Sequence, residues 1–226
     1  MKYFFVEEGS KNMKRILALV GDFYHSHDNL LKALKQATDA ALDNCEIIDA
    51  SIENFEQFLL QNPNAIVISA ENRINPQDEA VRCWMTENVA KRIKEYVEGG
   101  GRLFVWHSGL ASYPEEGEFC KLVRGYFKFH PENHKPVRYY SSREATLDNK
   151  EFDFEIMDEH YFVFCDKDNT NIYLYSESED GSSIAGWWHN FGKGKVVALT
   201  PAHREDGLLD NNFQELLKAV LTLLFK

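Results

Sequence analysis

The amino-acid sequence predicts an α/β fold with a mainly parallel sheet and an antiparallel extension in its C-terminal half. In the first half of the chain, short apolar runs alternate four times with segments of helical periodicity, which is typical of parallel sheets covered by helices on both faces. Beyond Pro136, short strands of alternating polarity follow one another instead. The 226 residues are 44% hydrophobic, enough to bury the core of a single domain over residues 1–226.

The N-terminal segment precedes the first elements of the alternating pattern. Residues 1–14 are expected to form either an extra edge strand or a flexible N-terminal segment, whereas Arg15–Val20 is predicted as a buried strand. Apolar side chains at helical spacing predict a helix over Leu30–Ala41, with Ser26 or Asp28 as its N-cap. The next predicted elements are a strand at Cys45–Ile48, a short helix at Ile52–Leu60 and a buried strand at Ala65–Ser69.

The following helix is expected to begin at Asn75 and Pro76 and to end at Gly99–Gly101. Asparagine is a good N-cap, proline presets the backbone of the first helical residue, and glycine adopts the left-handed angles that end helices. Leu103–Trp106 is then predicted as a central strand buried on both faces. His107 follows directly, at the end of that strand.

The second half contains one more helix and then mostly strands. A helix is predicted from Pro114 through Val123, Gly192–Gly194 reads as a hairpin turn, and an amphipathic helix over Phe213–Leu224 closes the chain. The predicted strands are Val137–Ser141, Phe152–Ile156, Tyr161–Cys165, Ile172–Tyr175, Ile184–Trp188 and Val196–Thr200.

Composition excludes several classes of function. The net charge of −11 and the absence of a Lys/Arg cluster argue against a nucleic-acid partner. No apolar run is long enough to span a membrane, and no signal peptide opens the chain, so we expect a cytoplasmic protein. The four cysteines are far apart, which predicts neither disulfides nor a thiolate zinc site. Monomer and homo-oligomer both stay open.

Polar residues that follow predicted strands are the candidates for a site, because ligands of doubly wound sheets bind outside the carboxyl ends of the strands. His107 and Ser108 follow the central strand. Gly109 stands two residues after His107, which is the spacing of a nucleophile elbow with an imidazole at its centre. A site residue and a hydrogen-bonded strand-end histidine are both compatible with this position.

Two further pairs have a spacing of two residues, which places both side chains on one face of an extended segment. His25 and His27 follow the first strand, so they suit either one metal ion or a solvated loop. His203 and Glu205 follow the last strand, and Glu205 is expected to orient the His203 imidazole as a general base unless it forms a surface charge pair. In Asp158–Tyr161, neighbouring side chains alternate, so only one carboxylate is expected to face a pocket.

The ordered set of motifs resembles ThuA-like trehalose-utilisation proteins over Arg15–Lys226. The segments that carry the resemblance are Gly99–Gly101 with His107-Ser108, Phe129-His130-Pro131, Asp158-Glu159 with Tyr161, Trp188 before Gly192–Val196, and the late His203. The resemblance implies a flavodoxin-like sheet similar to that of class I glutamine amidotransferases, with helices on both faces. It also implies a role in carbohydrate utilisation, with a small-molecule sugar as the partner.

The amidotransferase relatives carry a cysteine at the elbow and a late H-x-E pair, which His203-Arg204-Glu205 resembles. Here His107 occupies the elbow and Cys120 lies downstream in a predicted helix, so glutaminase activity is not expected without the thiolate. Lys195 stands where an arginine is usual, and Pro201-Ala202 precede His203 where a glycine is usual. Both departures concern the local geometry at His203.

The hypothesis from these residues is an enzyme that acts on a sugar or keto-sugar, of the isomerase or hydrolase type. The alternative is a non-catalytic sugar-binding or regulatory protein on the same scaffold. The metal-assisted version uses a divalent cation, zinc or manganese. The predicted catalytic residues are His107, His203, Glu159 and Glu205, the substrate-binding residues Ser108, His130, Tyr161 and Trp188, and the metal ligands His25, His107 and His203.

Overall fold

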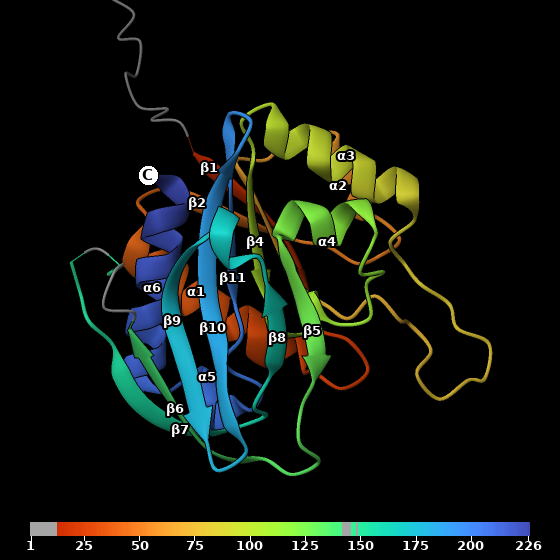
Figure 1. Ribbon diagram of the computed structural model, residues 1–226. Coiled ribbons are helices and arrows are strands. Elements are labelled where there is room, and N and C mark those ends of the chain that lie inside the picture. The colour runs from red at the N-terminus through yellow and green to blue at the C-terminus, as the bar shows by residue number, and fades with distance from the viewer. Residues whose placement is uncertain (1–12, 142–145, 148) are drawn as a thin grey trace, which may run out of the picture.

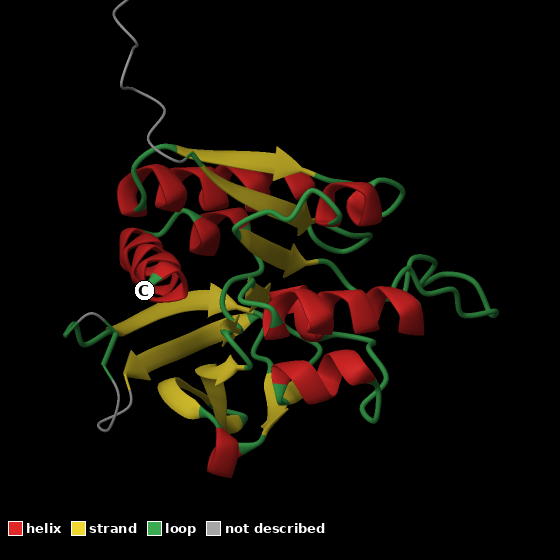
Figure 2. Cartoon of the chain, turned by 90° about the horizontal axis from the view of Figure 1, so that it is seen from above, coloured by secondary structure: helices red, strands yellow, loops and turns green. Residues whose placement is uncertain are grey.

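A computed structural model of the protein describes residues 13–141, 146–147 and 149–226 and shows a large sheet between two layers of helices (Figures 1 and 2). Its strand order is β2-β1-β3-β4-β11-β10-β9-β6-β7, and β5 pairs with β8 in a separate two-stranded sheet. The strands are β1 (Lys14–Val20), β2 (Cys45–Asp49), β3 (Ala65–Ser69), β4 (Arg102–Trp106), β5 (Gly125–Phe129), β6 (Lys135–Ser141), β7 (Asp153–Asp158), β8 (Phe162–Cys165), β9 (Asn171–Ser178), β10 (Gly181–Phe191) and β11 (Gly194–Leu199).

Helices cover both faces of the sheet, as predicted. The α-helices are α1 (His27–Ala41), α2 (Phe55–Leu59), α3 (Glu87–Glu98), α4 (Glu118–Val123), α5 (Glu205–Leu208) and α6 (Asn211–Phe225). Side chains alternate between the two faces of β1: Ile16 and Ala18 join the core beneath α1 and α6, whereas Leu17 and Leu19 join the core beneath α2, α3 and α4. Burial on both faces explains why the central strands read as continuous apolar runs.

Pairing within the sheet decides which strand ends meet. Strands β1, β2, β3, β4 and β11 run parallel, and β10 is antiparallel to β11. The antiparallel pairs β10–β9, β9–β6 and β6–β7 follow, so β7 again runs in the direction of β11. The carboxyl ends of β1, β4, β11 and β7 therefore lie at one edge, although β7 belongs to the antiparallel extension.

The glycine stop before the central strand is confirmed in detail. Gly100 has φ 121°, its N–H donates to the Val97 carbonyl, and the Gly101 N–H donates to the Tyr96 carbonyl. These two bonds form a Schellman motif, which requires a left-handed residue after the helix. The chain can then turn directly into β4 and deliver His107 to the opposite edge.

The predicted start of the same helix at Asn75 and Pro76 is wrong. Thr86 caps α3, and its side chain accepts a hydrogen bond from the Val89 N–H. Asn75 instead closes a loop: its amide donates to the Ala80 carbonyl over 2.6 Å and its oxygen accepts from the Arg82 N–H over 2.7 Å. The same side chain that caps helices also closes loops, so the residue type alone did not separate the two.

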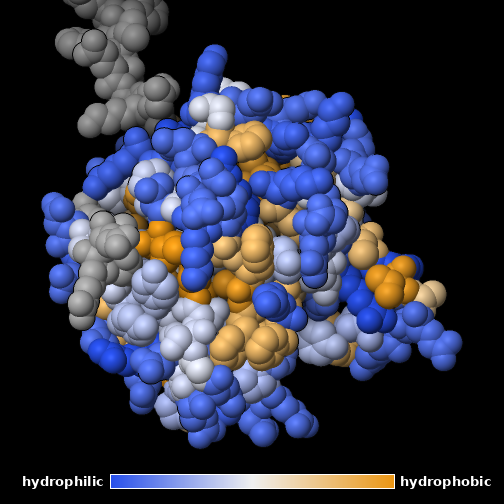
Figure 3. Space-filling model, in the orientation of Figure 1, coloured by the Kyte–Doolittle hydropathy of each residue, from blue (hydrophilic) through white to orange (hydrophobic). Residues whose placement is uncertain are grey.

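Three smaller differences concern the ends and number of elements. Strand β5 was not predicted, α4 begins at Glu118 and not at Pro114, and α2 is shorter than predicted. The expected extra strand or flexible segment at residues 1–12 lies outside the described residues. Within the described ranges, no helix is long and apolar enough to cross a membrane. The face shown in Figure 3 is mainly hydrophilic, with a small hydrophobic area near its middle.

Candidate functional site

Four side chains from four strand ends converge at the carboxyl edge of the sheet. They are His25 after β1, His107 after β4, Glu159 after β7 and His203 after β11, and one potential ligand atom of each lies within 4.8 Å of all the others. His25 and His107 are buried, whereas Glu159 and His203 are partly exposed. We call these four residues the histidine–glutamate cluster.

His107 is held in one orientation and one tautomer. Its backbone is left-handed (φ 46°), an uncommon conformation for a residue with a Cβ, and the side chain is fully buried. Nδ1 lies 2.5 Å from the Thr200 carbonyl oxygen, so this nitrogen carries the hydrogen. The Tyr161 ring stacks on the imidazole with centroids 4.0 Å apart. The lone pair of Nε2 is therefore directed at the cluster.

Gly109 makes room for this conformation. A Cβ at that position would lie 2.1 Å from the Ile68 carbonyl oxygen of β3, far inside contact distance. The turn after β4 thus packs directly on the backbone of a neighbouring strand, and only glycine fits. The position of Gly109 two residues after His107 indicated an elbow-like turn. The contact with Ile68 that requires glycine there is visible only in the structure.

His25 is oriented by Asp22. The Asp22 Oδ1 atom lies 2.6 Å from His25 Nδ1, and Oδ2 accepts a hydrogen bond from the Glu71 N–H after β3. Burial alone would raise the pKa of Asp22, but the hydrogen bond and charge of His25 outweigh it and lower the pKa to about 2. The carboxylate is thus ionised at neutral pH and holds the hydrogen of His25 on Nδ1, which leaves Nε2 free to bind a ligand.

Asp158 connects the other two members of the cluster. Its Oδ1 accepts hydrogen bonds from the backbone N–H groups of Glu159 (2.9 Å) and His203 (2.8 Å), and its Oδ2 accepts from the Tyr139 hydroxyl (2.7 Å). Asp158 is completely buried, while Glu159 points into the cluster. The expectation that only one of the two adjacent carboxylates faces a site therefore agrees with the structure.

Glu159 is the electrostatic centre of the cluster. Its Oε2 lies 3.3 Å from His203 Nδ1 and 3.5 Å from His107 Nε2, and its Oε1 lies 3.2 Å from His130 Nε2. Burial would raise the pKa of Glu159, but the contacts with His107 and His203 outweigh this effect and lower the pKa. His134 adds a further ring, with its centroid 4.8 Å from that of His203.

The cluster has the composition of a metal site, and three of its ring nitrogens lack hydrogen-bond partners among the described residues. His25 Nε2, His107 Nε2 and His203 Nδ1 are buried, and none of them makes a hydrogen bond to the described part of the chain. Buried polar atoms of proteins are otherwise almost always satisfied. Three imidazoles and one carboxylate form a ligand set typical of zinc and related transition cations. Asp22 and the Thr200 carbonyl accept the hydrogen from the other ring nitrogen of His25 and His107, which fixes the orientation of a metal-binding imidazole.

Several predicted site residues lie elsewhere. Glu205 does not orient His203: it begins α5, and its carboxylate lies 3.5 Å from Lys32 Nζ of α1. The prediction from the two-residue spacing assumed an extended chain, whereas the start of the helix turns Glu205 away. His27 is separated from His25 for the same reason, because Ser26 caps α1 and His27 is its first residue. His27 Nε2 lies 3.0 Å from the Asp49 carboxylate.

Trp188 and Ser108 also differ from the expected substrate-contacting positions. Trp188 lies beside Arg102 and Gly194, at the opposite edge of the sheet, and the Lys195 ammonium lies 5.4 Å from its ring centroid. Ser108 is fully buried beneath the site. Its substrate-contacting role would require an opening of the turn after β4, whereas His130 and Tyr161 both lie at the cluster.

The sequence did not identify Asp158 and Thr200 as parts of the site. Asp158 was visible only as one of two adjacent carboxylates, and a backbone acceptor such as Thr200 leaves no signal in residue type. Asp22 stands three residues before His25, but its role depends on the contact with Glu71, 49 residues away.

The fold and the cluster define the class: an α/β protein with a large, mostly parallel sheet between helices, an antiparallel extension, and a histidine–carboxylate centre at the carboxyl edge of the sheet. Residues 15–222 match the family model described as ThuA, trehalose utilisation. The chain therefore belongs to the ThuA family, which indicates a role in carbohydrate utilisation. None of the curated proteins matches the sequence.

Solved structures agree with this assignment at the level of the fold. A putative ThuA-like protein from Parabacteroides merdae is 12% identical, with a TM-score of 0.70 over 94% of this chain and 90% of that one. One from Bacteroides uniformis is 16% identical, with a TM-score of 0.63 over 94% and 89%. A β-galactosidase from Rahnella sp. R3 is 11% identical, with a TM-score of 0.61 over 92% of this chain, which spans only 31% of the galactosidase.

Proposed function

We propose that this protein is a sugar-processing enzyme of the isomerase or hydrolase type that binds a divalent transition cation, zinc or manganese, at the histidine–glutamate cluster. The observation that carries the proposal is the convergence of three buried imidazole nitrogens, none of them in a hydrogen bond to the described residues, and one carboxylate within 4.8 Å. Imidazole ligands favour transition cations over magnesium or calcium, which prefer oxygen.

The burial of His107 favours this reading over metal-free acid–base catalysis. Its side chain is 0% exposed, so it has no access to a substrate that approaches from solvent. Its Nε2 atom faces the Glu159 carboxylate, 3.5 Å away. A buried imidazole with its lone pair directed at a carboxylate and two other imidazoles is placed to bind a cation and not to exchange protons with a sugar.

The remaining groups have roles that follow from their positions. When bound, the cation polarises a carbonyl or lowers the pKa of a water molecule. Asp22 and the Thr200 carbonyl hold the tautomers of two ligands. His130 is about one third exposed and contacts Glu159 Oε1, so it is the histidine placed to hold a proton beside an incoming substrate.

The sugar class of the substrate rests on the family and not on the cluster. The family is described by trehalose utilisation, and structural neighbours include galactosidases, whose names state that they act on galactosides. The metal chemistry is compatible with attack on a keto-sugar carbonyl or on a glycosidic bond, and assays with both kinds of substrate distinguish the two reactions.

The test begins with metal content. The purified protein is dialysed against trace zinc, manganese or magnesium and analysed for metal, together with His107→Ala, His203→Ala and the control His189→Gln, whose ring lies outside the cluster and donates to the Leu122 carbonyl. We expect close to one zinc or manganese per chain in the wild type and the control, and loss of the metal in the other two variants. A metal-free wild type would refute the metal proposal.

Turnover is tested next with monosaccharides, disaccharides and their keto derivatives, with and without the retained metal. Metal-dependent conversion that is lost in His107→Ala supports the enzyme. Recovery of every bound sugar unchanged would refute catalysis and leave a sugar-binding role.

A further inference from the structure

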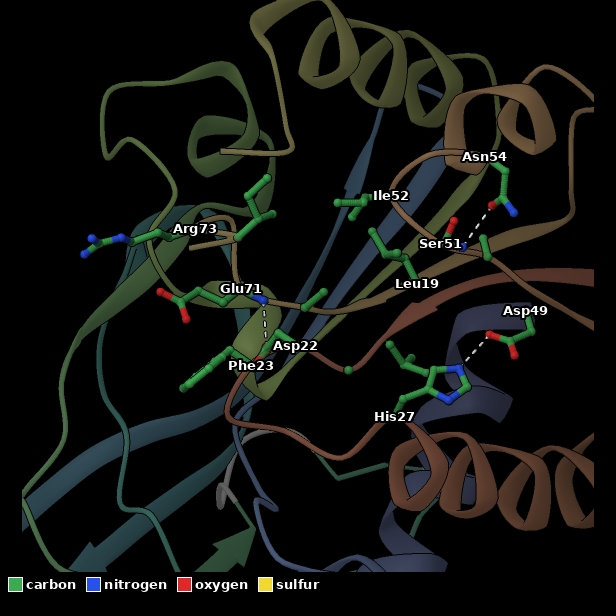
Figure 4. Close-up of a pocket in the computed structure, with 15 residues that line it drawn as sticks. Leu19, Asp22, Phe23, His27, Asp49, Ser51, Ile52, Asn54, Glu71 and Arg73 are labelled. Carbon is green, nitrogen blue, oxygen red and sulfur yellow. Dashed lines mark hydrogen bonds and ion pairs between the residues drawn. The ribbon is translucent and has the colours of Figure 1, made fainter. Parts of the chain in front are cut away.

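A concave region lies beside the histidine–glutamate cluster, over the carboxyl ends of β1, β2 and β3 (Figure 4). Its volume is about 550 Å³, enough for a sugar ring with ordered water. In the strand order β2-β1-β3-β4, the chain proceeds to opposite sides of β1, so the crevice lies at the switch point of the sheet. This is the general position of ligand sites in doubly wound folds.

The crevice and the cluster share a wall. Asp22 lines the crevice, and its Oδ1 lies 2.6 Å from Nδ1 of His25, whose opposite nitrogen belongs to the cluster. Glu71 also lines the crevice, and its N–H bonds the other oxygen of Asp22. One carboxylate and one imidazole therefore separate a ligand in the crevice from a cation at the cluster.

Large apolar side chains around the crevice are left in contact with solvent. Phe23 is 57% exposed, Ile52 36% and Ile74 40%, and all three line the crevice. The neighbouring Tyr24, which is 55% exposed, packs edge to face against Phe23 with centroids 5.0 Å apart. Exposed apolar groups gathered at a concave surface mark ligand sites, and aromatic rings offer a flat face to the C–H side of a sugar ring.

The polar groups of the crevice are mostly hydrogen-bond acceptors. Figure 4 shows Asp49 and His27 on one side and Asp22 and Glu71 on the other, while Ser51 and Asn54 close the upper end. The Asp49 carboxylate is 43% exposed and Glu71 lies beside the Ser112 hydroxyl, 2.6 Å away. Three carboxylates oppose one arginine, Arg73, which donates to the Asp78 carbonyl. This charge excludes phosphate and other anions and suits a neutral ligand rich in hydroxyl groups.

We propose that the crevice is a binding site for an uncharged, polyhydroxylated ring, a sugar or cyclic polyol, next to the cluster and distinct from it. The sugar class rests on the proposed function, but the site does not depend on the presence of the metal. The bound ring is either a remote part of the substrate or a separate sugar molecule, and both present the same chemistry to the crevice.

The test measures binding of glucose and trehalose by calorimetry to the metal-loaded wild type and to four variants. Phe23→Ala removes the aromatic face and Ile52→Trp fills the crevice. The matched control Phe164→Ala removes an aromatic of similar exposure, 46%, from the β5–β8 sheet. His107→Ala disrupts the cluster and leaves the crevice lining intact.

We expect at least one of the two sugars to bind, and the affinity to fall roughly tenfold or more in Phe23→Ala and Ile52→Trp but not in Phe164→Ala. Glucose binding that persists in His107→Ala indicates a separate sugar, whereas trehalose binding that needs both regions indicates a remote part of the substrate. The inference is overturned if neither sugar binds at millimolar concentration, or if both crevice variants bind as the wild type does. Failure of the metal proposal appears separately, in the metal content.

Discussion

Replacement of Asp158 tests whether this buried carboxylate assembles the histidine–glutamate cluster. Asp158→Ala removes the acceptor of three hydrogen bonds, from the N–H groups of Glu159 and His203 and from the Tyr139 hydroxyl, of 2.7 to 2.9 Å. Each buried donor left without a partner costs about 1–3 kcal/mol, and removal of the desolvated carboxylate returns part of that energy. We expect the free energy of unfolding to fall by about 3 kcal/mol.

The assay is urea unfolding of the metal-free protein, with Asp153→Ala as the control. Asp153 lies on the same strand, but its carboxylate is 58% exposed and pairs with Arg138 at the surface. Exposed pairs of this kind contribute about 0–1 kcal/mol, so the control is expected to unfold at nearly the urea concentration of the wild type. Asp158→Asn keeps an acceptor for the two backbone donors and is expected to lose about 1 kcal/mol.

The position of Asp158 also predicts a loss of metal affinity beyond the loss of stability. Because it holds the backbone of two ligands, zinc affinity in competition with a chelator is expected to fall about 10- to 100-fold in the folded Asp158→Asn variant. If Asp158→Ala unfolds at the same urea concentration as the wild type and binds zinc with unchanged affinity, the carboxylate neither stabilises the fold nor positions the cluster. That result would refute the reasoning.

Three further predictions concern other parts of the scaffold. Asp22→Asn is expected to weaken zinc binding about 10- to 100-fold, because it loosens the orientation of His25; unchanged affinity in chelator competition contradicts this. Gly109→Ala places a Cβ 2.1 Å from the Ile68 carbonyl oxygen, and we expect a loss of about 2 kcal/mol or more in urea unfolding, against no change if the turn adapts freely. Burial lowers the pKa of His189 from 6.5 to about 4. Between these pH values the unfolded chain binds a proton that the folded chain does not, so the stability present above pH 6.5 is lost as the pH falls toward 4. His189→Gln keeps a donor for the Leu122 carbonyl and should remove on the order of 2 kcal/mol of this loss, whereas an identical pH profile would show that His189 is not the source.

The sequence was sufficient for most elements because their signals are local. Apolar runs, helical periodicity and the glycine stop act over a few residues, and each appears in the structure. The start of α3 was misplaced because Asn75 satisfies the same backbone groups in a loop as at a helix cap. Strand β5 was missed because its partner, β8, lies 33 to 40 positions further along the chain.

The site shows the same division. The histidines at strand ends were predicted as site residues because the carboxyl ends of parallel strands lie at the same edge of the sheet, whatever the strand order. Glu159 could be suspected but not placed, since its approach depends on four antiparallel pairings that return β7 to the direction of β11. Glu205 was misassigned because a two-residue spacing has different meanings in an extended segment and at the start of α5.

The turn after β4 has the left-handed backbone of a nucleophile elbow, but an imidazole stands at its centre. A nucleophile at an elbow must be exposed to its substrate, and the left-handed backbone of that turn serves this purpose. His107 keeps the left-handed backbone, with φ 46°, and Gly109 keeps the close approach to β3, yet the imidazole is fully buried under Tyr161. Strain of this kind persists only where the surroundings enforce it. A fully buried imidazole cannot reach a substrate as a nucleophile. In the proposed function, the left-handed backbone of His107 serves to direct Nε2 at Glu159 and the other two histidines.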